Sequence, residues 1–277
     1  METENSSGVT YRLLTGISVT QSIQLDKHVA LLPADTSHLD FPTALSACGG
    51  PDDIAVVAAF IPRVTAQFRI TASSPEELAT HAWNSSWDAL LLSAVFLAEI
   101  SFNLDSNTSA ERISRQSTLR ATSLKMFGLS NQEPRLITAS DANWLTNNYG
   151  NAHELLSKES FRNAVHCLSS YRWHTAPRVR MAILWAGIEG LFGATSEIRF
   201  RLSVCAARFL HPDDSDARTA TFNDVKRLYN TRSKAVHGSK TKTAINNEVE
   251  ESAQLLCKLL RRCIEVRSLP DEKDLLP

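Results

Sequence analysis

The chain lacks the sequence patterns of several common functional sites. It has no Gly-rich phosphate-binding loop and no carboxylate pair spaced for magnesium. Its cysteines lie far apart, with no Cys-x2-Cys motif and no Cys/His spacing typical of zinc. They are Cys48, Cys167, Cys205, Cys257 and Cys263. We therefore expect neither a bound metal ion nor an organic cofactor.

Long apolar segments, internal repeats and low-complexity tracts are also missing. No apolar run approaches the roughly 20 residues that a transmembrane helix needs. Residues 1–5 lack the charge pattern of a secretory signal. Apolar residues make up 43% of the chain and charged residues 21%, which is a globular balance. We expect a cytoplasmic protein with no membrane association.

The net charge of -1 conceals an uneven distribution along the chain. Residues 1–150 carry 9 basic and 15 acidic side chains, whereas residues 151–277 carry 20 and 15. The second half is therefore the better candidate for contact with phosphates. Its small basic surplus suits a local, salt-sensitive patch rather than a strong long-range field.

The first 72 residues have strand-like patterns. Short apolar runs at 11–17 and 54–61 are broken by Gly and Pro, and residues 64–70 alternate between apolar and polar side chains. These patterns predict a small β-rich module over residues 1–72.

A helix is expected to start at Ser74-Pro75-Glu76-Glu77, because Ser can cap it, Pro suits its first position and Glu77 can complete a capping box. It should run towards Phe102, with Trp83 and other residues at helical spacing in the core. Residues 103–140 are polar and ambiguous. We interpret 73–139 as a helical connecting region.

The second half has helical patterns throughout. Helices are expected to start at Ser140-Asp141 and near Pro177, with later segments at 197–210, 221–232 and 246–267. The predicted fold class is α+β, in which the β-rich module precedes an all-α antiparallel helical bundle over 140–267. Residues 268–277 form a C-terminal tail.

The helix after Pro177 has a flank of small side chains formed by Ala182, Ala186 and Gly193. Glu189 is the only large residue among them. Small side chains allow another helix to approach closely, and a carboxylate in such a contact needs a partner. Arg232 and Arg201 are the candidates.

An arginine and a histidine, Arg232 and His237, lie five positions apart at an expected helix end. Arginine keeps its charge and histidine titrates near neutrality, so together they suit phosphate stabilisation and proton transfer. Arg232 continues the apolar stripe of Phe222, Val225 and Tyr229, and an inward guanidinium needs an anionic or carbonyl partner. RNA cleavage is the leading hypothesis.

An unbroken helix would place His237 about 140° around the axis from Arg232. The two side chains meet only if Gly238 ends the helix in a left-handed conformation and His237 folds back. Alternatively, two copies of the motif face each other across a symmetric dimer.

Three runs in order, 185–192, 197–202 and 228–238, resemble the Apea-like branch of the HEPN superfamily. The resemblance covers roughly residues 140–267. It implies a HEPN-type helical bundle that dimerises and brings two Arg-x4-6-His motifs into one cleft. Many HEPN proteins are metal-independent ribonucleases, often of toxin or antiphage systems.

The resemblance implies that Arg232 and His237 are the catalytic residues and that Glu189 orients Arg232. Many active relatives have Asn, Asp or His directly after the arginine, where this chain has Ser233, as is common in the Apea-like branch. RNA 2'-hydroxyl attack would leave a 2',3'-cyclic phosphate, with Ser233 and Lys234 positioning phosphates and Lys240 also contacting RNA.

Two alternatives remain at this stage. Arg232 and Glu189 can simply tie helices together, while His237 interacts with a helix dipole and the lysines are solvated. The chain can also be a non-catalytic HEPN module that dimerises or binds RNA without cleaving it.

Overall fold

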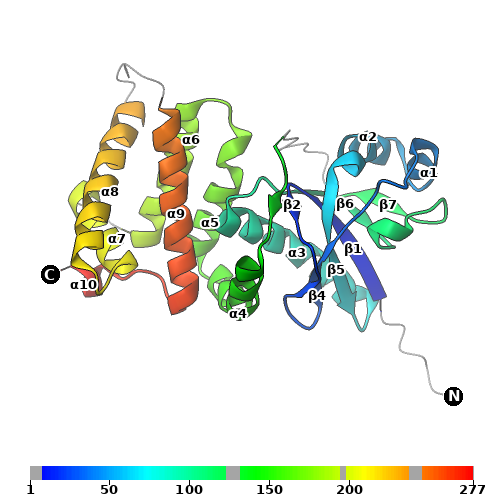
Figure 1. The fold of residues 1–277 in the computed structure, drawn as a ribbon, viewed down its shortest axis with the longest axis horizontal. Coiled ribbons are helices and arrows are strands. Elements are labelled where there is room, and N and C mark those ends of the chain that lie inside the picture. The colour runs from blue at the N-terminus through cyan, green and yellow to red at the C-terminus, as the bar shows by residue number, and fades with distance from the viewer. Residues whose placement is uncertain (1–7, 123–131, 194–197, 237–244, 277) are drawn as a thin grey trace. The chain divides into compact units, whose positions relative to one another are not determined.

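The computed structural model describes residues 8–122, 132–193, 198–236 and 245–276. The chain forms two compact units, one of residues 1–92 and 98–149 and the other of residues 93–97 and 150–277. An antiparallel sheet lies in the first unit and the second is helical (Figure 1). The predicted α+β class is therefore confirmed.

The main sheet has six strands in the order β3-β4-β5-β1-β6-β7, and all its neighbours are antiparallel. Its strands are β1 (Gly8–Thr15), β3 (Ile23–Gln24), β4 (Val29–Pro33), β5 (Val64–Ala72), β6 (Ser101–Ser106) and β7 (Leu119–Ala121). A parallel pair is formed by β2 (Ile17–Ser18) and β8 (Arg135–Leu136). The alternating pattern correctly predicted β5, whose apolar residues 64, 66, 68 and 70 are buried.

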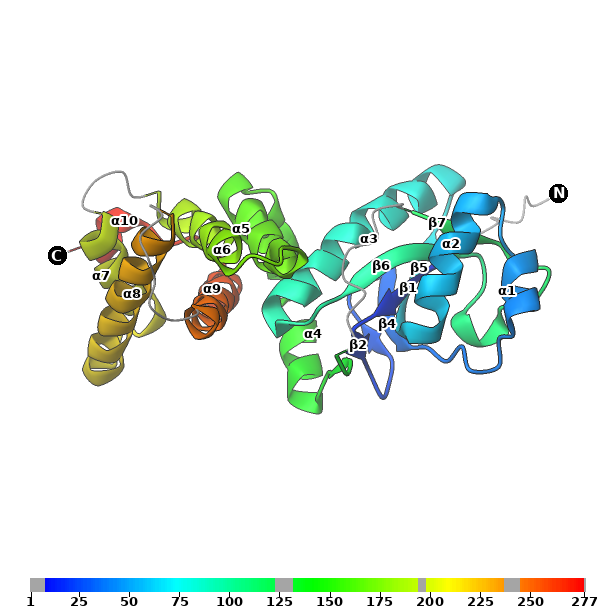
Figure 2. The same cartoon turned by 90° about the horizontal axis from the view of Figure 1, so that it is seen from above.

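Helices cover both faces of this sheet (Figure 2). Helices α1 (Phe41–Ser46) and α2 (Pro51–Phe60) pack on the face of Leu13 and Leu104. Helix α3 (Pro75–Phe96) lies on the other face, where Ser86 meets Arg12. Short 3-10 turns occur at η1 (Ile61–Arg63) and η2 (Ala110–Arg112).

The strand expected at residues 54–61 is wrong, because this segment lies mainly in α2. Pro51 occupies the start of the helix, and Asp52 and Asp53 lie in its first turn, where the helix dipole favours negative charge. A short apolar run alone does not distinguish a strand from a buried helix.

Residues 73–139 also differ from the expected helical connection. Helix α3 ends at Phe96, and the chain then returns to the sheet as β6 and β7. Arg12, only 3% exposed, joins these elements: its guanidinium donates to both oxygens of Asp105 on β6, at 2.9 and 3.0 Å, and to Ser86 Oγ on α3. A buried cation requires such pairing.

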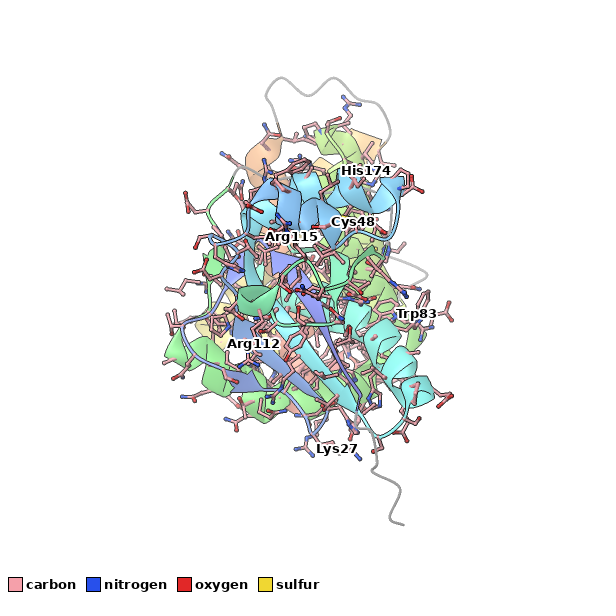
Figure 3. The ribbon with its side chains drawn as sticks, turned by 90° about the vertical axis from the view of Figure 1, so that its right-hand side faces the viewer. Lys27, Cys48, Trp83, Arg112, Arg115 and His174 are labelled. Carbon is pink, nitrogen blue, oxygen red and sulfur yellow. The ribbon has the colours of Figure 1, made fainter. Side chains whose placement is uncertain are left out.

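The cap of α3 forms largely as expected, because Ser74 Oγ accepts the Glu77 N–H and Glu77 reaches back to the Ser73 N–H. The expected core position of Trp83 is wrong, since its residue surface is 78% exposed and the side chain points away from α3 (Figure 3). Helical spacing identified the helix but extended its buried face by one turn too many.

The helical unit is built around α6 (Pro177–Phe192), which contacts α5, α8 and α9. Its other elements are α5 (Glu159–Ser170), η3 (Tyr171–Trp173), α7 (Ile198–Leu210), α8 (Ser215–Val236), α9 (Asn246–Val266) and α10 (Glu272–Leu275). Helix α4 (Ala139–Leu156) contributes its last residues to this unit. The expected helices after Ser140 and at Pro177 are confirmed.

The centre of α6 is closely packed. Trp185 is fully buried, and its indole N–H donates to Ser252 Oγ on α9 at 3.1 Å. Two residues further on, Gly187 lets α5 approach: a Cβ there would lie 3.0 Å from Cys167 Cβ and 3.4 Å from Ala164 Cα. The absence of a side chain at Gly187 sets the distance between α5 and α6.

The helices in the described residues do not meet the requirements of a bilayer span. None is both long and apolar enough to cross a membrane.

Gly187→Leu should destabilise the helical unit, because the new side chain must displace α5 and α9. Overpacking of this kind typically lowers the free energy of unfolding by about 1–3 kcal/mol. The matched control is Gly190→Leu, where a Cβ meets nothing within 4 Å. Urea unfolding should show a loss for the first variant and no loss for the second; equal losses would contradict this packing argument.

Candidate functional site: an arginine–glutamate pair between α6 and α8

Helix α8 carries Arg232 in its last turns. The helix starts after Asp214, whose carboxylate accepts the N–H groups of Asp216 and Ala217 at 3.1 and 2.9 Å. Val225 and Leu228 are buried against the rest of the unit. Arg232 lies seven residues after Val225, on a neighbouring line of the helix surface, and is directed towards α6.

The guanidinium of Arg232 meets the carboxylate of Glu189 on α6. Arg232 Nη2 lies 3.1 Å from both Glu189 Oε1 and Oε2, and only the bond to Oε2 has hydrogen-bond geometry. The two side chains are 21% and 23% exposed. Among the described residues, the buried Nε of Arg232 has no hydrogen-bond partner. The pair is thus held by one nitrogen and leaves donor capacity on the guanidinium.

An aromatic stack supports the arginine. The Arg232 guanidinium lies 5.6 Å from the centroid of the Tyr229 ring, and that ring packs edge-on against Trp185 at 5.3 Å. Cation–π contact of this kind restricts the guanidinium as well as attracting it. The orientation of Arg232 therefore depends on a fully buried residue of the core.

Burial and charge act in opposite directions on Glu189. Loss of water around the carboxylate raises its pKa above the usual 4.5, while the Arg232 guanidinium lowers it, and burial is the larger effect. The ion pair therefore only partly offsets the desolvation of Glu189. A carboxylate kept under these conditions is poorly explained by stability alone.

The other predicted site residues have different positions. Ser233 is half-buried and Lys234 is exposed. His237 and Lys240 lie outside the described residues. The meeting of Arg232 and His237, and their catalytic roles, thus stay predictions.

Glu189 was expected to pair with Arg232 or Arg201, and the structure selects Arg232. Arg201 instead pairs with Glu272 of α10 at 3.0 Å. The expected close helix contact along Ala186 and Gly193 is wrong, because both residues are exposed. Helix α5 approaches at Gly187 instead, on the buried side of α6.

Tyr229 was expected only as part of an apolar stripe, and its ring contact with Arg232 was missed. The signal in the sequence was an aromatic residue three positions before an arginine on one helix, which places them on neighbouring lines.

Within the described residues, no group of three His, Cys, Asp or Glu side chains is placed to hold a metal ion. No protein-family model, curated protein or solved structure matches this chain.

Glu189→Gln should gain stability relative to the natural chain as the pH rises from about 4 to about 7. The raised pKa means that the fold favours protonated Glu189, so the contribution of this carboxyl is greatest below its ordinary pKa of 4.5 and is lost as the pH rises through the folded value. Glutamine does not titrate. Urea unfolding of both proteins at the two pH values measures the difference; a change in the opposite direction would show that attraction to Arg232 exceeds the effect of burial.

Proposed function

We propose that this chain is a metal-independent endoribonuclease of the HEPN type. The observation that carries the proposal is the placement of Arg232, whose guanidinium is oriented by Glu189 and Tyr229 and pairs with the carboxylate through Nη2. Phosphate oxygens are acceptors suited to a guanidinium held in this way. The resemblance of the surrounding sequence to Apea-like HEPN proteins supports the same reaction.

In the proposed reaction, the RNA 2'-oxygen forms a bond to the adjacent phosphorus and the bond from phosphorus to the 5'-oxygen breaks. One proton leaves the 2'-hydroxyl and one reaches the leaving 5'-oxygen, with His237 transferring protons. The products are a 2',3'-cyclic phosphate and a 5'-hydroxyl. Arg232 contacts the non-bridging oxygens, where negative charge increases in the transition state.

Glu189 has a positioning role in this proposal. Its carboxylate restricts the guanidinium of Arg232 by contact with Nη2. The carboxylate makes no such contact with the other two guanidinium nitrogens, which keep their donor capacity. Ser233 and Lys234, next along α8, are proposed to contact neighbouring phosphates. We propose that the protein acts on RNA in the cytoplasm, in a toxin or antiphage system. We also propose that it forms a homodimer in which the two Arg-x4-His motifs share a cleft.

Arg232→Gln and His237→Ala should each lower the rate of RNA cleavage in EDTA. Removal of the proton-transfer group is expected to slow the reaction by about 100-fold to 10,000-fold. Loss of one charged donor to the transition state should have an effect of about 100-fold to 1,000-fold. Cleavage of single-stranded RNA, followed by end-group analysis for 2',3'-cyclic phosphate, measures both.

Arg227→Gln is the matched control, because Arg227 lies on the same helix but pairs with Glu251 and Asp224 away from Glu189. It should cleave at the natural rate. If the natural protein forms dimers or binds RNA but yields no cyclic phosphate, the nuclease proposal is wrong and a non-catalytic HEPN module takes its place. A rate unaffected by Arg232→Gln would also overturn the assignment.

A further inference from the structure

Two phenylalanines on α7 and α8 form an exposed aromatic pair. Phe200 is 56% exposed although its side chain is large and apolar. Its ring centroid lies 6.1 Å from that of Phe222, with the planes at 79°. The edge-to-face packing fixes the orientation of both rings, and Phe200 keeps much of its surface open to solvent.

Cationic and polar groups surround this pair. The Lys226 ammonium lies 5.7 Å from the Phe222 ring centroid, one helical turn further along α8. On α7, the exposed Arg199 donates to Asn230 Oδ1 at 3.2 Å, which joins the two helices beside Phe200. We call Arg199, Phe200, Phe222 and Lys226 the α7–α8 aromatic face.

The α7–α8 aromatic face continues along α8 towards the candidate site. Phe222, Lys226, Tyr229 and Ser233 are spaced at i, i+4, i+7 and i+11, so they follow one line of the helix. The row spans about 16.5 Å at 1.5 Å per residue. It ends beside Arg232, whose guanidinium packs on the Tyr229 ring.

We propose that the α7–α8 aromatic face binds single-stranded RNA by stacking an unpaired base on Phe200, with Arg199 and Lys226 contacting the flanking phosphates. The inference rests on the proposed function, and it adds the form of RNA that the protein accepts. The face selects unpaired nucleotides because the rings of a duplex are stacked on one another and cannot reach Phe200. It tolerates different sequences because every base has an aromatic face.

Charge complementarity favours RNA over an apolar protein partner. Residues 177–193 and 198–236, which form α6 to α8, carry 10 basic and 5 acidic side chains. Cations beside exposed aromatic rings, as Arg199 and Lys226 lie beside Phe200 and Phe222, are typical of surfaces that follow a phosphate backbone and stack its bases. Contact with an apolar protein surface would bury Arg199 and Lys226 without anionic partners.

Phe200→Ala in the full chain should weaken binding of a fluorescein-labelled single-stranded RNA by about 5-fold to 150-fold, which corresponds to the usual loss of one stacked base. Fluorescence anisotropy is measured in EDTA, and a 2'-O-methyl group at every position of the RNA probe prevents cleavage during the measurement. A duplex of the same sequence should bind more weakly than the single strand, and Phe200→Ala should leave its affinity unchanged.

Matched variants separate stacking from general apolarity. Phe200→Leu keeps an apolar side chain but no aromatic face, so it should bind as weakly as Phe200→Ala, whereas Phe200→Trp should retain the natural affinity. Phe41→Ala removes a phenylalanine of similar exposure, 57%, in the other unit and should have no effect. Lys226→Gln should weaken binding and reduce its dependence on salt concentration.

The outcomes for this face and for the nuclease are distinguishable. The stacking proposal would be overturned if Phe200→Leu bound the RNA probe with the natural affinity. It would also be overturned if Phe200→Ala lost dimers but kept its affinity for the probe, and this result would indicate that a second copy of the chain covers the face. Lack of probe binding by the natural chain would also overturn it. Binding that depends on Phe200 without any cyclic-phosphate product would refute the nuclease and leave the stacking face in place.

Discussion

The candidate site depends on a carboxylate that is held where burial opposes its charge. Glu189 lies on α6 directly after the fully buried Ile188, so the helix that forms the core also withdraws this side chain from water. Arg232 supplies the compensating charge through a single nitrogen. The attraction between the two charges does not outweigh the cost of removing Glu189 from water, so the pair adds little to the stability of the fold. Its main effect is to fix the orientation of both side chains.

That constraint extends to Arg232 through the packing of α6. Trp185 anchors α6 against α9, and the Tyr229 ring packs against it with the two planes at 82°. The guanidinium lies over the same Tyr229 ring. One helix thus connects the interior with the candidate site: any shift of α6 moves both the carboxylate and the aromatic support of Arg232. A rigid position for a charged donor is what stabilisation of a developing charge requires.

Local patterns in the sequence identified most elements of the second unit and part of the first. The alternation at β5 and the cap at Ser74 were readable because their causes lie within a few residues. The pairing of β6 with β1 was not, since residues about 90 positions apart meet there through backbone hydrogen bonds that leave no local periodicity. The buried Arg12–Asp105 pair is another such long-range contact.

The site shows the same division. The need of Glu189 for a cation followed from its small neighbours, and Arg232 was one of two expected partners. The small residues themselves misled, because helix spacing does not tell which flank another helix covers: Gly187 meets α5, while Ala186 and Gly193 face solvent. Trp83 was misplaced for the same reason. Periodicity identifies a face, and only tertiary packing decides whether it is covered.

The modest basic surplus of residues 151–277 limits how RNA can be bound. A strong field would bind any polyanion and make the protein indifferent to strandedness. With few excess charges, affinity in the proposed complex must come in large part from contacts that do not depend on net charge, and an exposed aromatic ring is the main source of such contacts. Phe200 lies on α7 and Arg232 on α8, so stacking and phosphate contact act through different elements. In the proposed complex, an RNA strand whose base stacks on Phe200, at the Phe222 end of the α8 row, presents its backbone to the Arg232 guanidinium at the other end.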